Sequence, residues 1–184
     1  MTRPVERSEI LDYVTYGEVR SGILEEVLKQ KKPRRVHLGE YLTLLFENHQ
    51  TVRFQIQEMI RVEQIVKESD VQHEIDTYNE LLGSEGELGA TLLIEIDDPE
   101  ERAALLRDWK TLPKHLFVEL EGGQKVCAAF DERQMGEDRL SSVQYLKFAT
   151  SRRVPLAAGS DHPLLQERTP FTEEQREALA SDLA

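Results

Sequence analysis

The segment TVRFQIQEMIRVEQIVKESDVQHEIDTYNELL, residues 51–82, carries the clearest helical pattern in the chain. Its apolar residues recur at helical spacing, which predicts a central pair of helices at about 50–67 and 70–82. With an advance of ~100° per residue, the apolar residues of the first helix cover an arc of roughly 240°. A helix with so wide an apolar face is expected to be contacted on several sides.

The same apolar arc also contains polar side chains. Glu58, Glu63 and Gln55 fall among the apolar positions of the first helix, and Glu74 does so in the second. A buried carboxylate must find a cation, hydrogen-bond donors or a proton. Because Glu58 and Glu63 lie roughly 140° apart on the wheel, they would need different neighbours. The sequence therefore predicts buried acids in these helices and leaves their partners open.

The flanking sequence predicts strands and further helices. Residues 8–31 fit one or two amphipathic helices, and RRVHLGEYLTLLFEN, residues 34–48, fits two short strands joined by a tight turn at Gly39-Glu40. Capping patterns place helix starts at Ser69, Asp98 and Thr172. Further strands are predicted at ATLLIEI, HLFVEL, KVCAAF, SSVQYLKFAT and RVPLA, and a hairpin at Glu121-Gly122-Gly123-Gln124 joins the second to the third.

This order of elements predicts an α+β fold, in which helices pack on an antiparallel or mixed sheet of about six or seven strands. No interior stretch rich in Gly, Ser or Pro offers a linker, so we expect a single domain over residues 1–184. Within it we expect a helical clasp at 1–31, a core at 34–149, and a carboxyl-terminal strand and helix at 150–184.

Charge and composition limit the classes of partner. The formal net charge of -12 opposes a nucleic-acid backbone, so we expect no nucleic-acid partner. The exception is the basic segment KQKKPRR, Lys29 to Arg35, whose cations suit a solvated helix end; alternatively they could meet an acidic protein surface or an anionic ligand. Neither a membrane-length apolar run nor a signal-peptide core is present, so we expect a cytoplasmic protein without a membrane partner. The oligomeric state is left open.

Several side chains are candidates for a metal site. The acids Glu58, Glu63 and Glu74, with His73 of the Asp70-x-x-His73 pattern, could ligate iron or another divalent metal. Glu95, within the predicted central strand ATLLIEI, and Asp97, just after it, fall on the same side as Leu93 and could join them. Against this, His73 lies on a polar face, and buried acids often serve structural ion pairs instead. Arg35, Arg61 and Arg102 are the arginines proposed for such pairs, with Gln55 bonded to backbone.

Familiar catalytic motifs are missing from the sequence. There is no Walker loop, dinucleotide-binding glycine pattern, nucleophile elbow or zinc pattern. The single cysteine, Cys127, alternates within a strand and is expected to fill the core. Tyr78-Asn79 and Gln144-Tyr145 could give hydrogen bonds to a ligand.

The chain also resembles a bacterial family known as the domain of unknown function 3501 family. The resemblance spans roughly residues 34–148 and rests on four blocks in the same order, FENHQTVRFQIQEMIRVEQI, IDTYNELL, ATLLIEIDDPEERAALL and SSVQYLKF. The family has no established activity. Its genes often lie beside those for rubrerythrin and an iron-sulfur oxidoreductase, which implies partners of these kinds and a role near non-haem iron or peroxide stress. Members commonly have His where this chain has Gln144, and Ile-Pro where it has Leu82-Gly83.

Three hypotheses for function remain. The first is a non-catalytic accessory protein that binds an iron or redox partner through its acidic surface or the basic segment. The second is a metal-binding protein or metalloenzyme that uses the acids named above. The third is a metal-free enzyme with Glu58 as general base and Arg61 and Tyr78 orienting a small substrate.

Overall fold

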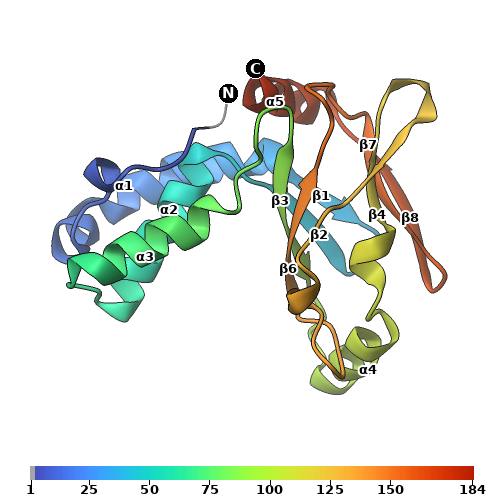
Figure 1. Ribbon diagram of the computed structural model, residues 1–184, viewed down its shortest axis with the longest axis horizontal. Coiled ribbons are helices and arrows are strands. Elements are labelled where there is room, and N and C mark those ends of the chain that lie inside the picture. The colour runs from blue at the N-terminus through green and yellow to red at the C-terminus, as the bar shows by residue number, and fades with distance from the viewer. Residues whose placement is uncertain (1–2) are drawn as a thin grey trace.

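The structure, a computed structural model, describes residues 3–184 and places a layer of three helices beside two sheets (Figure 1). The helices of this layer are α1 (Tyr13–Lys31), α2 (His49–Glu63) and α3 (Glu68–Asn79), and the sheets carry α4 (Pro99–Asp108) and α5 (Glu173–Leu183). The strands are β1 (Arg35–Leu38), β2 (Leu42–Phe46), β3 (Leu88–Ile94), β4 (Leu116–Glu119), β5 (Lys125–Cys127), β6 (Val143–Phe148), β7 (Ala157–His162) and β8 (Leu165–Pro170).

Both sheets are four-stranded and antiparallel, with strand orders β1-β2-β3-β6 and β5-β4-β7-β8. The predicted α+β class is therefore confirmed, although the strands of residues 3–184 are slightly more numerous than the six or seven expected. The difference lies near RVPLA, where one strand was predicted and the hairpin β7–β8 follows instead. Its strands contain few β-branched residues, and β8 alternates exposed and half-buried positions, so the sequence signal there is weak.

The inner faces of the two sheets share one hydrophobic core. Alternating residues of β2, β3 and β6 point into it, because successive side chains of a strand face opposite sides. Phe46 is completely buried there and lies 6.2 Å from the ring of Phe148 and 5.8 Å from that of Phe171. Trp109, just after α4, is buried in the same core.

The helical layer has a separate apolar cluster, in which Val52, Ile56 and Ile60 of α2 meet Val71 and Ile75 of α3. These residues lie at helical spacing, so the predicted pair of helices is present. Both helices are shorter than predicted. Because Gln64 adopts a left-handed conformation (φ 50°), α2 ends at Glu63.

The early end of α2 corrects the predicted burial of its last turn. Val62 is 63% exposed, Val66 is 78% exposed and lies beyond the helix, and Glu63 is exposed as well. The wheel assumed a helix that continued to 67 and was packed along its whole length. The predicted cap at Ser69 is also wrong, since α3 begins after Lys67 with no side-chain cap.

Other local signals are confirmed. Asp98 caps α4 by accepting from the backbone N–H groups of Glu100 and Glu101, and Thr172 caps α5 through its exchange with Gln175. The predicted hairpin joins β4 to β5. Cys127, however, is exposed, because β5 is an edge strand of its sheet.

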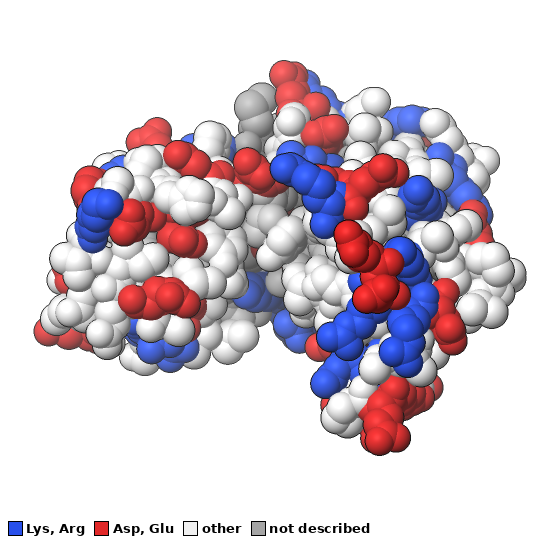
Figure 2. Space-filling model, turned by 60° about the horizontal axis from the view of Figure 1, so that its bottom comes forward, with Lys and Arg blue, Asp and Glu red and all other residues white. Residues whose placement is uncertain are grey.

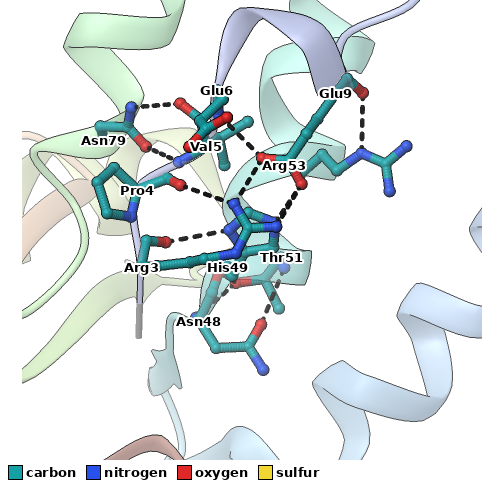
Figure 3. A network of polar contacts seen from close by, with 10 residues as sticks. All are labelled: Arg3, Pro4, Val5, Glu6, Glu9, Asn48, His49, Thr51, Arg53 and Asn79. Atoms are coloured by element: carbon teal, nitrogen blue, oxygen red, sulfur yellow. Dashed lines mark hydrogen bonds and ion pairs between the residues drawn. The ribbon is translucent and has the colours of Figure 1, made fainter. Parts of the chain in front are cut away.

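Figure 3 shows how the amino-terminal segment is fastened to the helical layer. The side-chain amide of Asn79, at the end of α3, donates to the carbonyl of Val5 (3.0 Å) and accepts from its N–H (2.8 Å). Glu9 binds Arg3 (2.7 Å) and His49 (3.0 Å), the first residue of α2. The segment before α1 thus ties α2 to α3. Within residues 3–184, no helix is both long enough and apolar enough to cross a membrane.

Candidate functional site

Glu58 is a residue of α2, and its carboxylate faces α1. It accepts hydrogen bonds from side chains of both helices. The guanidinium of Arg20 binds both carboxylate oxygens, at 2.7 and 2.9 Å. The hydroxyl of Tyr16, which is completely buried, donates to Oε1 at 2.8 Å, and Arg61 donates from the next turn at 3.1 Å. Two arginines and a tyrosine therefore satisfy this carboxylate.

The pKa of Glu58 follows from these contacts. The hydrogen bonds from Arg20 lower the pKa to about 2, against a weaker opposing effect of partial burial. Burial and the bond to Glu58 raise the pKa of Tyr16. A carboxylate with so low a pKa is a weak base at neutral pH. Of the three groups in the metal-free enzyme hypothesis, Glu58 and Arg61 therefore meet as an ion pair, while Tyr78 lies elsewhere, on α3.

The metal candidates are spread over the helical layer. Glu63 and His73 are exposed, whereas Glu74 and Gln55 are half-buried. Within the described residues 3–184, no three His, Cys, Asp or Glu side chains are grouped so that they could hold a metal ion. The structure therefore does not bring Glu58, Glu63, His73 and Glu74 together.

The candidates outside the central helices have separate surroundings. Glu95, beyond the end of β3, is exposed and accepts a hydrogen bond from Thr43 (2.6 Å), and Asp97 is exposed. Gln144 is completely buried on the core side of β6; its amide donates to Ser141, and its Oε1 has no partner among the described residues. Asn79 serves the amino-terminal segment (Figure 3).

A pocket of about 570 Å³ lies where the end of α3 faces β6 and the loop after β5; we call it the α3–β6 pocket. Tyr78 and Leu81 form the helical wall, and Tyr145 and Lys147 form the sheet wall. Phe130 comes from the loop after β5. The remaining lining residues are Thr77, Glu80, Ala129, Asp131, Gln134 and Leu146.

Strand alternation builds the sheet wall. In β6, Gln144 and Leu146 face the core, so Tyr145 and Lys147 face the helices. Gln134 covers the free edge of the strand, since its side chain accepts from the N–H of Tyr145 (2.7 Å) and donates to its carbonyl (3.4 Å). This side chain takes the place of a neighbouring strand at that residue.

The polar groups of the pocket are available to a ligand. Among residues 3–184, neither the hydroxyl of Tyr78 nor that of Tyr145 has a hydrogen-bond partner, and Lys147 has no ion pair. Tyr145 is 41% exposed. Partial burial and nearby Tyr78 and Glu47 raise its pKa, so its hydroxyl stays protonated at neutral pH and can donate. Asp131, in contrast, is bound by Arg133 at 2.8 Å.

Sequence reasoning named Tyr78 but missed Lys147 and Phe130 as lining residues. It paired Tyr145 with Gln144 as possible donors to one ligand, although adjacent residues of a strand face opposite sides. The alternation of SSVQYLKF was the available signal, because it puts Tyr145 and Lys147 on one face. No local pattern links that face to the end of α3, since their proximity depends on the tertiary fold.

These features define a class of protein. It is an α+β protein with a pocket between a helical layer and the outer face of a sheet, and polar groups of this pocket have no partner among residues 3–184. A family model described as a protein of unknown function, DUF3501, matches residues 4–183, so the chain belongs to this family. It is similar to a crystal structure titled a novel protein of unknown function, from Burkholderia pseudomallei K96243. The two share 29% sequence identity over 99% of this chain and 100% of that chain, with a TM-score of 0.90. Among curated proteins, none matches.

Proposed function

We propose that this protein is a non-catalytic accessory protein that binds a partner protein in the α3–β6 pocket. The observation that carries the proposal is the pocket itself, whose walls are formed by Tyr78, Leu81, Phe130 and Tyr145; its tyrosine hydroxyls and Lys147 have no partner among residues 3–184. Aromatic side chains, tyrosine among them, are typical of the few residues that dominate protein interfaces. A matching partner would insert an apolar side chain and place a carboxylate near Lys147.

The kind of partner is suggested by the family resemblance. Genes of the family often lie beside those for rubrerythrin and an iron-sulfur oxidoreductase, so we take a rubrerythrin-like or iron-sulfur protein as the partner to test. The contacts of Glu58 favour an accessory role over the enzyme hypothesis, since its carboxylate is engaged by two arginines and Tyr16.

Calorimetric titration of the purified chain with a rubrerythrin from the same genome tests this proposal. Tyr145→Ala should weaken binding by at least about tenfold, because truncation of a dominant aromatic contact costs about 2 kcal/mol or more and about 1.4 kcal/mol is tenfold. Leu164→Ala is the matched control, since Leu164 is 64% exposed and lies in the β7–β8 turn, outside the pocket. Absent binding, or equal losses in both variants, would refute the proposal.

The metal-binding hypothesis needs its own measurement. The chain is purified without chelator or affinity tag, and its iron, manganese and zinc are determined by elemental analysis. Stoichiometric metal that disappears in Glu74→Gln would favour a metalloprotein over a purely accessory one. Under the accessory proposal we expect a melting temperature that iron and manganese do not change, because a ligand of the native state must stabilise it.

A further inference from the structure

A second pocket, of about 360 Å³, lies where the end of α1 meets β1. Leu28 and Lys31 come from the last turns of α1, Lys32 from the 3-10 helix that follows, and Arg35 and His37 from the outer face of β1. We call this the basic pocket. Its lining includes no acidic residue, although the chain has 35 acidic residues and 23 basic ones.

The basic segment divides into paired and unpaired cations. Lys29 binds Glu26 (2.8 Å) and Glu25 (3.4 Å) on the surface of α1, and Arg34 binds Asp182 in the interior. Within residues 3–184, the three cations of the pocket have no ion pair; they are Lys31, Lys32 and Arg35.

Lys31 is half-buried in the lining of the pocket. Its ammonium lies 5.1 Å from the ring centre of Phe54, an arrangement that attracts a cation to the ring face. Burial lowers the pKa of Lys31, and the negative charge of Glu47 opposes this shift. The carboxylate of Glu47 accepts hydrogen bonds from the hydroxyls of Thr51 and Thr91, and among the ion pairs of residues 3–184 none joins it to Lys31.

His37 is oriented by a chain of hydrogen bonds. The hydroxyl of Thr43 donates its only proton to Glu95 (2.6 Å), because a carboxylate only accepts. The same oxygen must therefore accept the hydrogen bond that it shares with Nδ1 of His37 (2.9 Å). The proton of the neutral ring consequently lies on Nδ1. Nε2 of the neutral ring is then an acceptor, and it can receive a hydrogen bond from a ligand hydroxyl such as the P–OH of a phosphate monoanion.

We propose that the basic pocket binds a small phosphate-bearing ligand, with Lys31, Lys32 and Arg35 as its cationic contacts and Nε2 of His37 as the acceptor for a ligand hydroxyl. Within residues 3–184, three cations without an ion pair line the pocket and no acidic side chain lines it, so the lining is positively charged. A phosphate monoester carries about −1.5 to −2 charge at neutral pH and accepts bonds from guanidinium and ammonium groups. A single carboxylate would leave charge unmatched.

The size and the charge of the molecule favour a compact ligand. The pocket is lined only by the last turn of α1, the 3-10 helix that follows it and strand β1. Figure 2 shows basic side chains on both sides of the notch between the helical layer and the sheets. A long nucleic acid would extend past the pocket onto the rest of a chain whose formal net charge is -12. This site is separate from the α3–β6 pocket, so its test does not depend on the proposed partner.

The test is a titration with inorganic phosphate at constant ionic strength, followed by amide chemical shifts of the full chain. We expect saturable shifts in residues 31–37 and no saturable shifts with acetate. Arg35→Gln and Lys32→Gln should each raise the dissociation constant by about tenfold, as expected for loss of a charged hydrogen bond. Lys29→Gln is the matched control and should change it by less than about twofold.

Two results would overturn the proposal. One is an absence of saturable shifts for phosphate in the intact chain. The other is an equal loss of affinity in Lys29→Gln and Arg35→Gln, which would show general attraction to a positive surface instead of binding in the pocket. Far-ultraviolet circular dichroism of each variant verifies that it is folded.

Discussion

At the scale of single residues, the contacts of Glu58 lead to a pH prediction. Its pKa is about 2, below the ordinary value of 4.5. A lowered pKa contributes stability above pH ~4.5, and this contribution is lost as the pH falls towards about 2. We expect Glu58→Gln to lower the free energy of unfolding by about 2 kcal/mol at pH 7, because two arginines lose their negatively charged partner and one of the two acceptor oxygens is replaced by an NH2 group. Urea denaturation between pH 7 and 2 measures this difference, which should shrink towards the acid end.

Glu63→Gln is the control for this experiment. Glu63 is exposed at the end of α2, so its replacement should change stability by less than about 0.5 kcal/mol. Arg3 and His49 also lower the pKa of Glu9 to about 2. The stability of Glu58→Gln should therefore still depend on pH to some extent. A difference between wild type and Glu58→Gln that stays constant from pH 7 to 2 would contradict the assigned pKa.

At the scale of elements, local patterns predicted most of the fold. Capping residues such as Asp98 and Thr172 act within one helical turn, so the sequence alone shows them. The same holds for the alternation in β1 and β6. The hairpin β7–β8 was missed because its strands are stabilised by pairing across the sheet more than by their own residues.

The candidate site was harder to predict than the elements. The wheel of α2 identified Glu58 as an acid that needs partners, but Arg20 and Tyr16 come from α1, whose packing no local pattern specifies. Gln57 falls outside the apolar arc of the same wheel, yet its side chain is 2% exposed and bonds to the backbone of Leu11. A helical wheel shows which residues share a face. It does not show which neighbour covers that face.

Two glycines test how the elements are joined. A Cβ on Gly89, at the start of β3, would lie 1.9 Å from the carbonyl oxygen of Leu81, so Gly89→Ala must displace backbone. We expect a loss of about 3 kcal/mol or more. A Cβ on Gly17, exposed within α1, would meet nothing within 4 Å, and Gly17→Ala should add up to about 1 kcal/mol through helix propensity. Thermal and urea unfolding of both variants measure this contrast; equal effects would contradict it.

At the scale of the whole molecule, the helical layer and the sheets have separate apolar clusters, and the structure must hold them together. Arg34 and Asp182 contribute to this. Arg34 follows α1, and Asp182 lies near the end of α5, which packs against the sheets. The side chains are 6% and 8% exposed and form two hydrogen bonds, at 2.8 and 2.9 Å. Arg34 therefore connects the segment that follows α1 to α5.

Arg34→Met should consequently destabilise the whole protein by about 3–5 kcal/mol, the usual effect of removing one partner of a buried ion pair. Lys32→Met, in the same short helix but without an acidic partner among residues 3–184, should change stability by less than about 0.5 kcal/mol. Circular dichroism reports the helices, and fluorescence of Trp109, the single tryptophan, reports the sheet core. Because the pair joins the two parts, both signals should move to lower urea concentration in Arg34→Met. A shift in only one signal would show that the pair stabilises one part alone.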